Sequence, residues 1–211
     1  GSHVQRFNIT YNHAWTSFFW FHDVNAMYAD YLKLKEYANM HTTVHTIELM
    51  TNILTNLENA ARVGLFDGEM FGKEVQELKT IKGREDLSRA SRLFLELFFS
   101  EHRLLQMVHC EQDPTPELKK LAELIETSAN YPDISFDSQI TIIEMIGRVI
   151  DDNEEYEKLI DKISEISALR KSEVEGAIIH FNRAQTLIDK QQYKPVVKHL
   201  GHCVQAFMKE G

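Results

Sequence analysis

Two histidines and a glutamate near the start of a predicted helix have the residue types of a metal site. His41 and His45 are four residues apart and Glu48 follows three residues later, so a continuous helix places all three side chains on one face. Metal sites in helical bundles are built from histidines and acids on facing helices. The segment before this helix carries three more such side chains: His13, His22 and Asp23.

The apolar residues of the same helix favour a different role for these histidines. At about 100° per residue, His41, His45 and Glu48 project almost opposite the apolar stripe of the helix. They then point away from the core unless another helix covers that side. A solvated or helix-capping role is therefore the alternative to a metal site. The stripe consists of Ile47, Met50, Ile53, Leu54, Leu57 and Ala61.

An arginine and a histidine farther along the chain enclose five residues. The spacing of Arg103 and His109 resembles the arginine–five residues–histidine motif of the helical ribonuclease superfamily called HEPN. This resemblance implies RNA cleavage, with His109 as the acid or base and Arg103 steadying the phosphate charge. Leu104 stands where that family commonly has a polar residue. The alternative is that both side chains lie at the rim of a buried helix.

Two His-Cys dipeptides, His109-Cys110 and His202-Cys203, supply the ligand types of a tetrahedral zinc site. Cys203 falls in the apolar stripe of its predicted helix and His202 falls on the far side, so one helix does not present both to one ion. We therefore interpret both cysteines as small buried apolar residues.

Helices are the elements that must position these residues. Apolar periodicity and capping residues predict an all-α chain of eight or nine helices, with no pairable strand pattern. Residues 1–3 look like a tag remnant, and residues 4–211 are interpreted as a single domain with a possible weak subdivision near Asn130–Asp133. The predicted helices cover residues 12–37, 43–63, 69–81, 84–110, 116–128, 137–150, 154–170, 172–190 and 195–209.

One of these helices, over about 84–110, carries the most apolar stretch of the chain. Ten of the sixteen residues from Leu93 to Val108 are large and apolar, and they spread around most of the helix circumference. A helix that is apolar on nearly every side must be surrounded by other elements. We therefore expect an antiparallel bundle, or a set of helical hairpins, around this buried central helix.

The first predicted helix is rich in aromatic residues, which also spread around its circumference. It is interpreted either as a second central helix or as a surface on which part of the aromatic set binds a partner chain. The candidate partner-binding residues are Trp15, Phe18, Phe19, Trp20 and Phe21.

The segment from Glu175 to Met208 resembles one tetratricopeptide unit. The resemblance implies an antiparallel helix hairpin or a capping pair, but no second copy occurs at the same period, and a solenoid needs at least three stacked units. The sequence departs from the family at Val196 and Cys203, where alanine is usual. The matching residues are Ala184, Leu187, Tyr193, Val196, Leu200 and Cys203.

Composition limits the classes of partner. The formal net charge of −9 makes nucleic acid an unlikely partner, because phosphates need clustered Lys and Arg. Two distant cysteines favour a reducing compartment such as the cytoplasm, and no apolar run approaches the roughly 20 residues that span a bilayer.

We therefore expect a non-enzymatic, helical protein–protein interaction or regulatory module, which is a candidate fragment of a longer protein. Its partner would be another protein or a second copy, and we expect no cofactor. The alternative is an enzyme on a helical scaffold, with either the His41/His45 metal site or the Arg103/His109 ribonuclease site.

Overall fold

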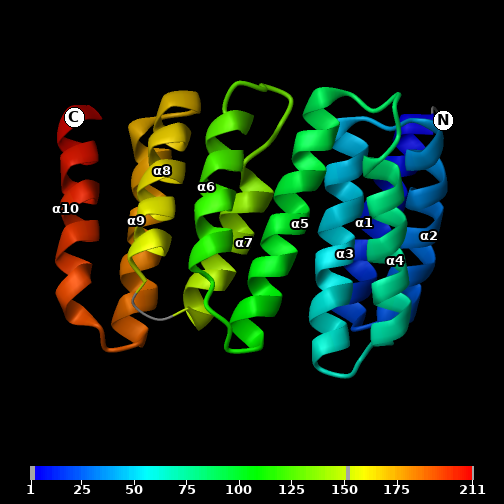
Figure 1. Ribbon diagram of the computed structural model, residues 1–211, viewed down its shortest axis with the longest axis horizontal. Coiled ribbons are helices and arrows are strands. Elements are labelled where there is room, and N and C mark those ends of the chain that lie inside the picture. Colours follow the sequence, from blue (N-terminus) through cyan, green and yellow to red (C-terminus); the bar gives the residue numbers. More distant parts are fainter. Residues whose placement is uncertain (1–2, 151–152, 211) are drawn as a thin grey trace. The chain divides into compact units, whose positions relative to one another are not determined.

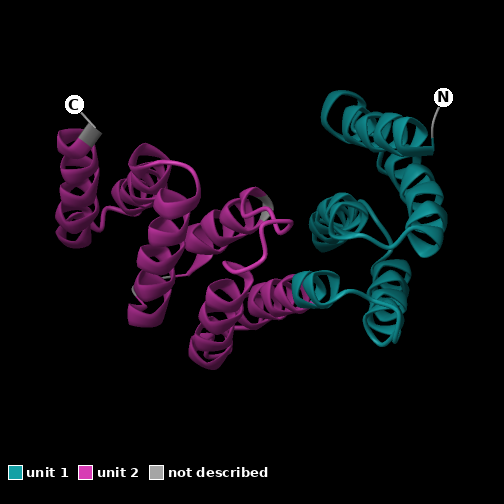
Figure 2. Ribbon diagram, turned by 90° about the horizontal axis from the view of Figure 1, so that it is seen from above, with its two compact units in different colours: residues 1–95 teal, residues 96–211 magenta. Residues whose placement is uncertain are grey.

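A computed structural model describes residues 3–150 and 153–210, without the side chains of Ser138 and Glu210. Within these ranges the secondary structure consists of helices with no strand, which confirms the all-α prediction (Figure 1). The described residues form ten helices, so the prediction of eight or nine is slightly too low. The chain divides into two compact units, residues 1–95 and 96–211 (Figure 2).

The first unit contains α1 (His3–Phe21), α2 (Val24–Met40), α3 (Val44–Arg62), α4 (Gly68–Lys82) and the start of α5 (Arg89–His109). The additional helix arises here, because the predicted helix over 12–37 is two helices. His22 has φ 54°, in the left-handed region, and the Asp23 side chain accepts a 2.9 Å hydrogen bond from the Ala26 N–H. Asp23 is thus the N-cap of α2 and reverses the chain.

The hairpin of α1 and α2 packs on α3, and α3 packs on α4. His3, the only described residue of the predicted tag remnant, already belongs to α1, and its ring stacks on that of Tyr37. A buried acid links α2 to α4: Glu74 accepts hydrogen bonds from Tyr28 at 2.9 Å and from Lys35 at 2.6 Å. The core of this unit includes Met27, Tyr31, Leu34, Ile47, Met50, Leu54, Leu57 and Leu78.

The sequence predicts a helix buried on nearly every side over residues 84–110, and the burial is confirmed for the middle of α5. This helix runs from Arg89 to His109 and crosses the boundary between the two units after Leu95. Arg103, between buried residues, and His109, the last residue of the helix, are exposed. Its buried apolar residues are Leu93, Phe94, Leu95, Leu97, Phe98, Leu104 and Leu105.

The second unit contains the rest of α5, followed by α6 (Thr115–Ser128), α7 (Asp137–Val149), α8 (Glu154–Arg170), α9 (Glu173–Asp189) and α10 (Tyr193–Glu210). Helix α8 packs on α6 and on α9, α7 packs on α9, and α9 packs on α10. The stretch Asn130–Asp133, predicted as a possible subdivision, lies inside this unit between α6 and α7. The Arg170 guanidinium donates hydrogen bonds to the Ser128, Ala129, Tyr131 and Ile134 carbonyls around it.

In the described part of the chain, none of the helices combines the length and the apolar character that crossing a bilayer requires.

Candidate functional site

A cluster of charged and imidazole side chains lies between α8, α9 and α10 of the second unit. Each helix contributes two residues, spaced three or four apart, so that both lie on the face that meets the neighbouring helices. The six residues are Glu157 and Asp161 from α8, His180 and Arg183 from α9, and His199 and His202 from α10.

Four of these residues form a continuous polar chain inside the unit. Arg183 donates to Glu157 Oε1 from both Nε, at 2.9 Å, and Nη2, at 2.5 Å. His199 Nε2 lies 2.8 Å from Glu157 Oε2, and His199 Nδ1 lies 3.0 Å from His180 Nδ1. Because His180, Arg183 and His199 are at most 3% exposed, these contacts satisfy groups that water does not reach.

The order of these contacts assigns one role to each ring nitrogen that faces the interior. Burial alone would raise the pKa of Glu157, but the hydrogen bonds from His199 and Arg183 hold it below its usual value, so the group is a carboxylate. A carboxylate only accepts, so His199 donates to Glu157 through Nε2. Nδ1 of His199 and Nδ1 of His180 share one hydrogen bond, which leaves Nε2 of His180 as the ring nitrogen outside the polar chain.

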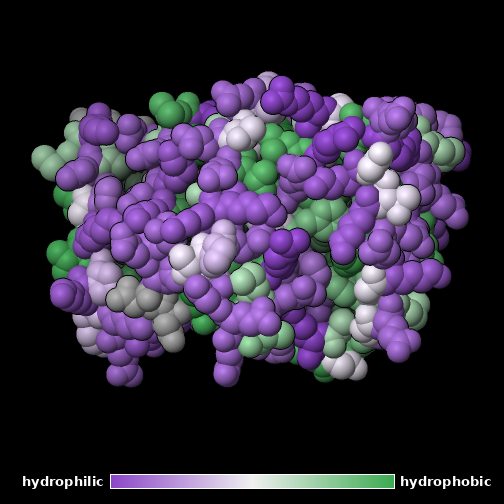
Figure 3. All heavy atoms as spheres, in the orientation of Figure 1, coloured by the Kyte–Doolittle hydropathy of each residue, from purple (hydrophilic) through white to green (hydrophobic). Residues whose placement is uncertain are grey.

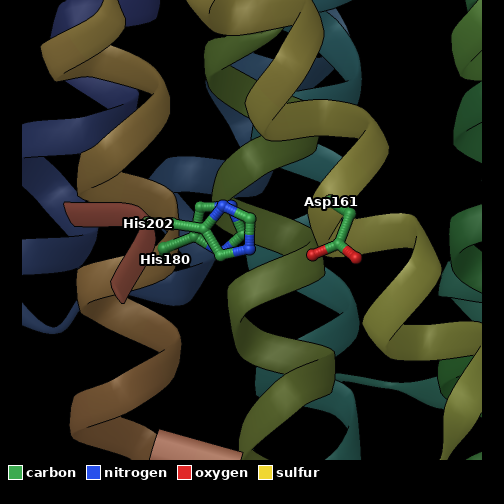
Figure 4. A group of neighbouring side chains, drawn as sticks. All are labelled: Asp161, His180 and His202. Atoms are coloured by element: carbon green, nitrogen blue, oxygen red, sulfur yellow. The ribbon is translucent and has the colours of Figure 1, made fainter. Parts of the chain in front are cut away.

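The second part of the cluster has the residue types of metal ligands. One ligand atom each from Asp161, His180 and His202 lie within 4.8 Å of one another, and the described residues contain no other such group of three (Figure 4). The rings of His180 and His202 are nearly parallel, with centroids 4.2 Å apart. Figure 4 shows Asp161 pointing toward the two rings from the neighbouring helix. Burial, reinforced by the neighbouring His202 and His199, lowers the pKa of His180 to about 4, so its imidazole is neutral at pH 7.

An open groove of about 450 Å³ lies beside these three residues. It runs between α8, α9 and α10, and Gly176 forms part of its floor. A Cβ at position 176 would lie 2.7 Å from the Ser164 carbonyl oxygen, so glycine is what lets α9 approach α8 this closely. The groove also reaches Glu165, Glu173 and Lys209 at its edges.

Helix α10 has a second apolar face that nothing in the described chain covers. Its inner face packs on α9 through Val196, Cys203 and Ala206, which are at most 7% exposed. The outer face is turned about 120° from the inner one and is apolar over four turns. Figure 3 shows green, hydrophobic patches at the edge where α10 lies in the same view. The outer face consists of Tyr193, Val197, Leu200, Val204, Phe207 and Met208, which are 40–79% exposed.

The aromatic residues predicted to bind a partner lie on α1 and differ in exposure. Phe19, Trp20 and Phe21 are 50%, 81% and 74% exposed, at the C-terminal end of the helix. Trp15 and Phe18 are half-buried, and both rings pack against Phe19. This segment therefore does not form a wholly buried second central helix. Partner binding by its exposed end stays a prediction.

The structure does not bring His41, His45 and Glu48 together as three ligands. The sequence places them on one continuous helix, but His41 is the C-cap of α2 and the next helix begins after Thr43, its N-cap. Thr43 and Thr46 form a reciprocal capping box there. The two histidines therefore belong to different elements.

Arg103 and His109 are both exposed near the end of α5. Arg103 donates a 3.4 Å hydrogen bond to Glu117 on α6, which also binds Ser100 at 2.6 Å and Lys120 at 3.1 Å. These contacts place Arg103 at the rim of the helix and fit its structural interpretation. Ribonuclease activity stays a prediction.

The two cysteines differ in their surroundings. Cys203 is buried on α10 and donates to the Ala177 carbonyl at 3.4 Å, as predicted for a small apolar residue. Cys110 is exposed just after the last residue of α5, so its predicted burial is wrong. His202 contacts His180 on α9, a pairing that the His-Cys dipeptides do not indicate. The paired spacings within α8, α9 and α10 were the available signal.

Helices α9 and α10 follow each other in the chain and pack on each other, and the tetratricopeptide resemblance of this pair stays a prediction. No protein-family model, curated protein or solved structure matches the chain.

Proposed function

We propose that the protein is a non-enzymatic helical interaction module that assembles with a second copy of itself through the outer face of α10. The observation that carries this proposal is the uncovered apolar face of that helix, Tyr193 to Met208. A helix at the end of a row of packed helices needs a polar outer side if water is its only neighbour. The outer side of α10 is apolar, which favours packing against another helix.

The spacing of the outer face favours a second copy as that neighbour. Its first five residues are separated alternately by four and three positions, the pattern of a seam between two packed helices. The face is also symmetric about Leu200 to within one position: Tyr193 matches Phe207, and Val197 matches Val204. Two antiparallel copies of α10 related by a two-fold axis at Leu200 therefore place these apolar residues against one another along the seam.

The centre of this symmetric face contains a glycine. A Cβ added at Gly201 would meet no atom within 4 Å, so packing inside the chain does not require glycine there. An exposed glycine in a helix interior costs roughly 0.5–1 kcal/mol relative to alanine. The missing side chain lets a second helix backbone approach closely beside Leu200, which gives the residue a role in the dimer.

The area of the outer face is of the right size for such a dimer. Its six side chains expose on the order of 600 Å² of apolar surface per copy, and a standard interface buries roughly 800 Å² per partner. Three exposed apolar residues on α9 enlarge the surface: Ile178, Phe181 and Ile188. These residues of α9 and the outer face of α10 are turned by a similar angle from the contact between the two helices. Because α9 and α10 are antiparallel, faces turned in this way lie on the same side of the hairpin and adjoin each other.

Analytical ultracentrifugation of the full chain tests this proposal over a range of concentrations. We expect a concentration-dependent species of twice the 24.5 kDa chain mass. Leu200→Glu places a charge at the centre of the seam and should reduce dimerisation at least about tenfold, because a buried unpaired charge is costly. Circular dichroism should show an unchanged helix content, since Leu200 is already 40% exposed.

Gln205→Glu is the matched control. It introduces the same charge on the same helix, at an exposed position on the polar side of α10. We expect this variant to dimerise as the unchanged chain does. A chain that stays monomeric at every concentration overturns the proposal, as does equal dimerisation of the two glutamate variants.

A further inference from the structure

We propose that Asp161, His180 and His202 bind a divalent transition-metal ion, with zinc the closest match, and leave one coordination position open to the groove between α8, α9 and α10. This inference goes beyond the proposed assembly and does not rest on it. It also departs from the expectation, drawn from the sequence, that the chain has no cofactor.

The donor set carries the choice of metal. Two imidazoles and one carboxylate are typical of three-ligand sites that bind zinc and related first-row metals with an open position. Magnesium and calcium prefer all-oxygen sites, and the two histidines disfavour them. Donors of a bound zinc ion lie about 3.3 Å apart, so the group within 4.8 Å closes by a small movement of its side chains.

His180 is oriented in advance for this role. Its Nδ1 lies 3.0 Å from Nδ1 of His199, whose Nε2 lies 2.8 Å from Glu157 Oε2, so Nε2 is the nitrogen of His180 that is left for an ion. A ligand histidine whose second nitrogen is hydrogen-bonded to a fixed group is the usual arrangement at metal sites, and that bond orients the ring. Here the fixed group is an imidazole that is itself held by a carboxylate, which Arg183 fixes in place.

His202 supplies the movement that closes the site. Its ring is partly exposed, and it stacks on His180 with no side-chain hydrogen bond in the part of the chain that the structure describes. A rotation of the His202 side chain, which the open groove permits, lets the lone pairs of both rings converge on one ion.

Asp161 has a competing partner that a metal ion would displace. Lys198 Nζ lies 2.8 Å and 3.1 Å from the two Asp161 carboxylate oxygens. The side chains of this ion pair are 48% and 34% exposed, and such solvent-exposed pairs contribute little to stability. Exchanging the lysine for a divalent ion therefore has a small cost. It also implies that Lys198 weakens metal binding.

Isothermal titration with Zn²⁺, and the visible absorption of Co²⁺ added in its place, measure binding directly. All proteins carry His3→Ala, which removes the histidine of the predicted tag remnant. We expect one zinc ion per chain in the parent. His202→Ala should lower the affinity at least about tenfold and weaken the Co²⁺ spectrum, and it leaves the buried polar chain intact. Lys198→Ala should raise the affinity, because Asp161 is then unpaired.

His45→Ala is the matched control, because it removes an exposed histidine from the alternative site on α3. We expect its zinc affinity to equal that of the parent. The proposal is overturned if the parent binds no zinc, if His202→Ala binds as tightly as the parent, or if His45→Ala is the variant that loses affinity. The proposal is also overturned if His202→Ala leaves the Co²⁺ spectrum unchanged.

Discussion

His180 and His199 face each other with their Nδ1 atoms 3.0 Å apart, in the interior between α9 and α10. Since two lone pairs repel, one of the two nitrogens must carry a proton and donate to the other. On its other side, His199 donates to Glu157 through Nε2. The contact therefore links the buried Arg183–Glu157 ion pair to His180 and the groove beside it.

Removing Arg183 should destabilise the second unit strongly. Its side chain is 2% exposed and its loss leaves the Glu157 carboxylate without its cation, so we expect Arg183→Leu to lower the free energy of unfolding by about 3 kcal/mol. Urea unfolding followed by circular dichroism measures the change. Lys158→Leu, which breaks an exposed ion pair on α8, the helix that carries Glu157, should cost less than about 1 kcal/mol. An equal decrease in the free energy of unfolding for the two variants would show that the buried ion pair contributes no more than the exposed one.

Glu101 should make stability depend on pH. It is 2% exposed on α5, its Oε1 atom is buried with no hydrogen-bond partner, and burial raises its pKa to about 8. The folded state then holds a proton that the unfolded state releases above about 4.5, so stability is lost as the pH rises from about 4.5 to about 8.

Glu101→Gln, which resembles the protonated acid, removes this loss. We expect it to stabilise the chain by roughly 1–3 kcal/mol at pH 8 and to have little effect at pH 4. Urea unfolding at the two pH values measures both. Glu123→Gln, at an exposed position on α6, serves as the control. A stabilisation that is the same at both pH values would contradict the proposed titration of Glu101.

The break between α1 and α2 should depend on the cap at Asp23. Replacing it with alanine leaves the Ala26 N–H unpaired, so Asp23→Ala should cost about 1 kcal/mol, whereas Asp23→Asn keeps the acceptor and should cost less. His22→Gly should be neutral or stabilising, because glycine adopts φ 54° without strain. Chemical denaturation measures all three, and a cost for His22→Gly above that for Asp23→Ala would count against this description of the turn.

Local signals in the sequence predicted most of the helices. Ser172 caps α9 by accepting from the Glu175 N–H, and Gly64 with φ 76° follows the end of α3; serine and glycine at such positions are local signals of a helix start and a helix end. The single helix over 12–37 was wrong because its aromatic residues obscured the capping signal of Asp23. Apolar periodicity is unchanged across a two-residue turn, so only the cap marks the break.

The polar cluster was beyond prediction for a different reason. Glu157, His180 and His199 are separated by 23 and 19 residues in the chain, and their meeting depends on how α8, α9 and α10 pack. Spacing within one helix shows only which residues share a face. His41 and His45 are the reverse case, in which the sequence predicts a site that the structure does not form. A spacing of four residues brings two side chains together only on a continuous helix, and a new helix starts after Thr43, between the two histidines.

Disulfide cross-linking at the proposed two-fold axis tests the role of α10 most directly. In a Cys110→Ser background, Leu200→Cys places a thiol where the antiparallel seam brings residue 200 against its own copy, within the reach of a disulfide. Lys194→Cys places one outside the outer face of the same helix. We expect a covalent dimer on mild oxidation for Leu200→Cys and little for Lys194→Cys. No cross-linking at position 200, or equal cross-linking at both positions, would contradict it.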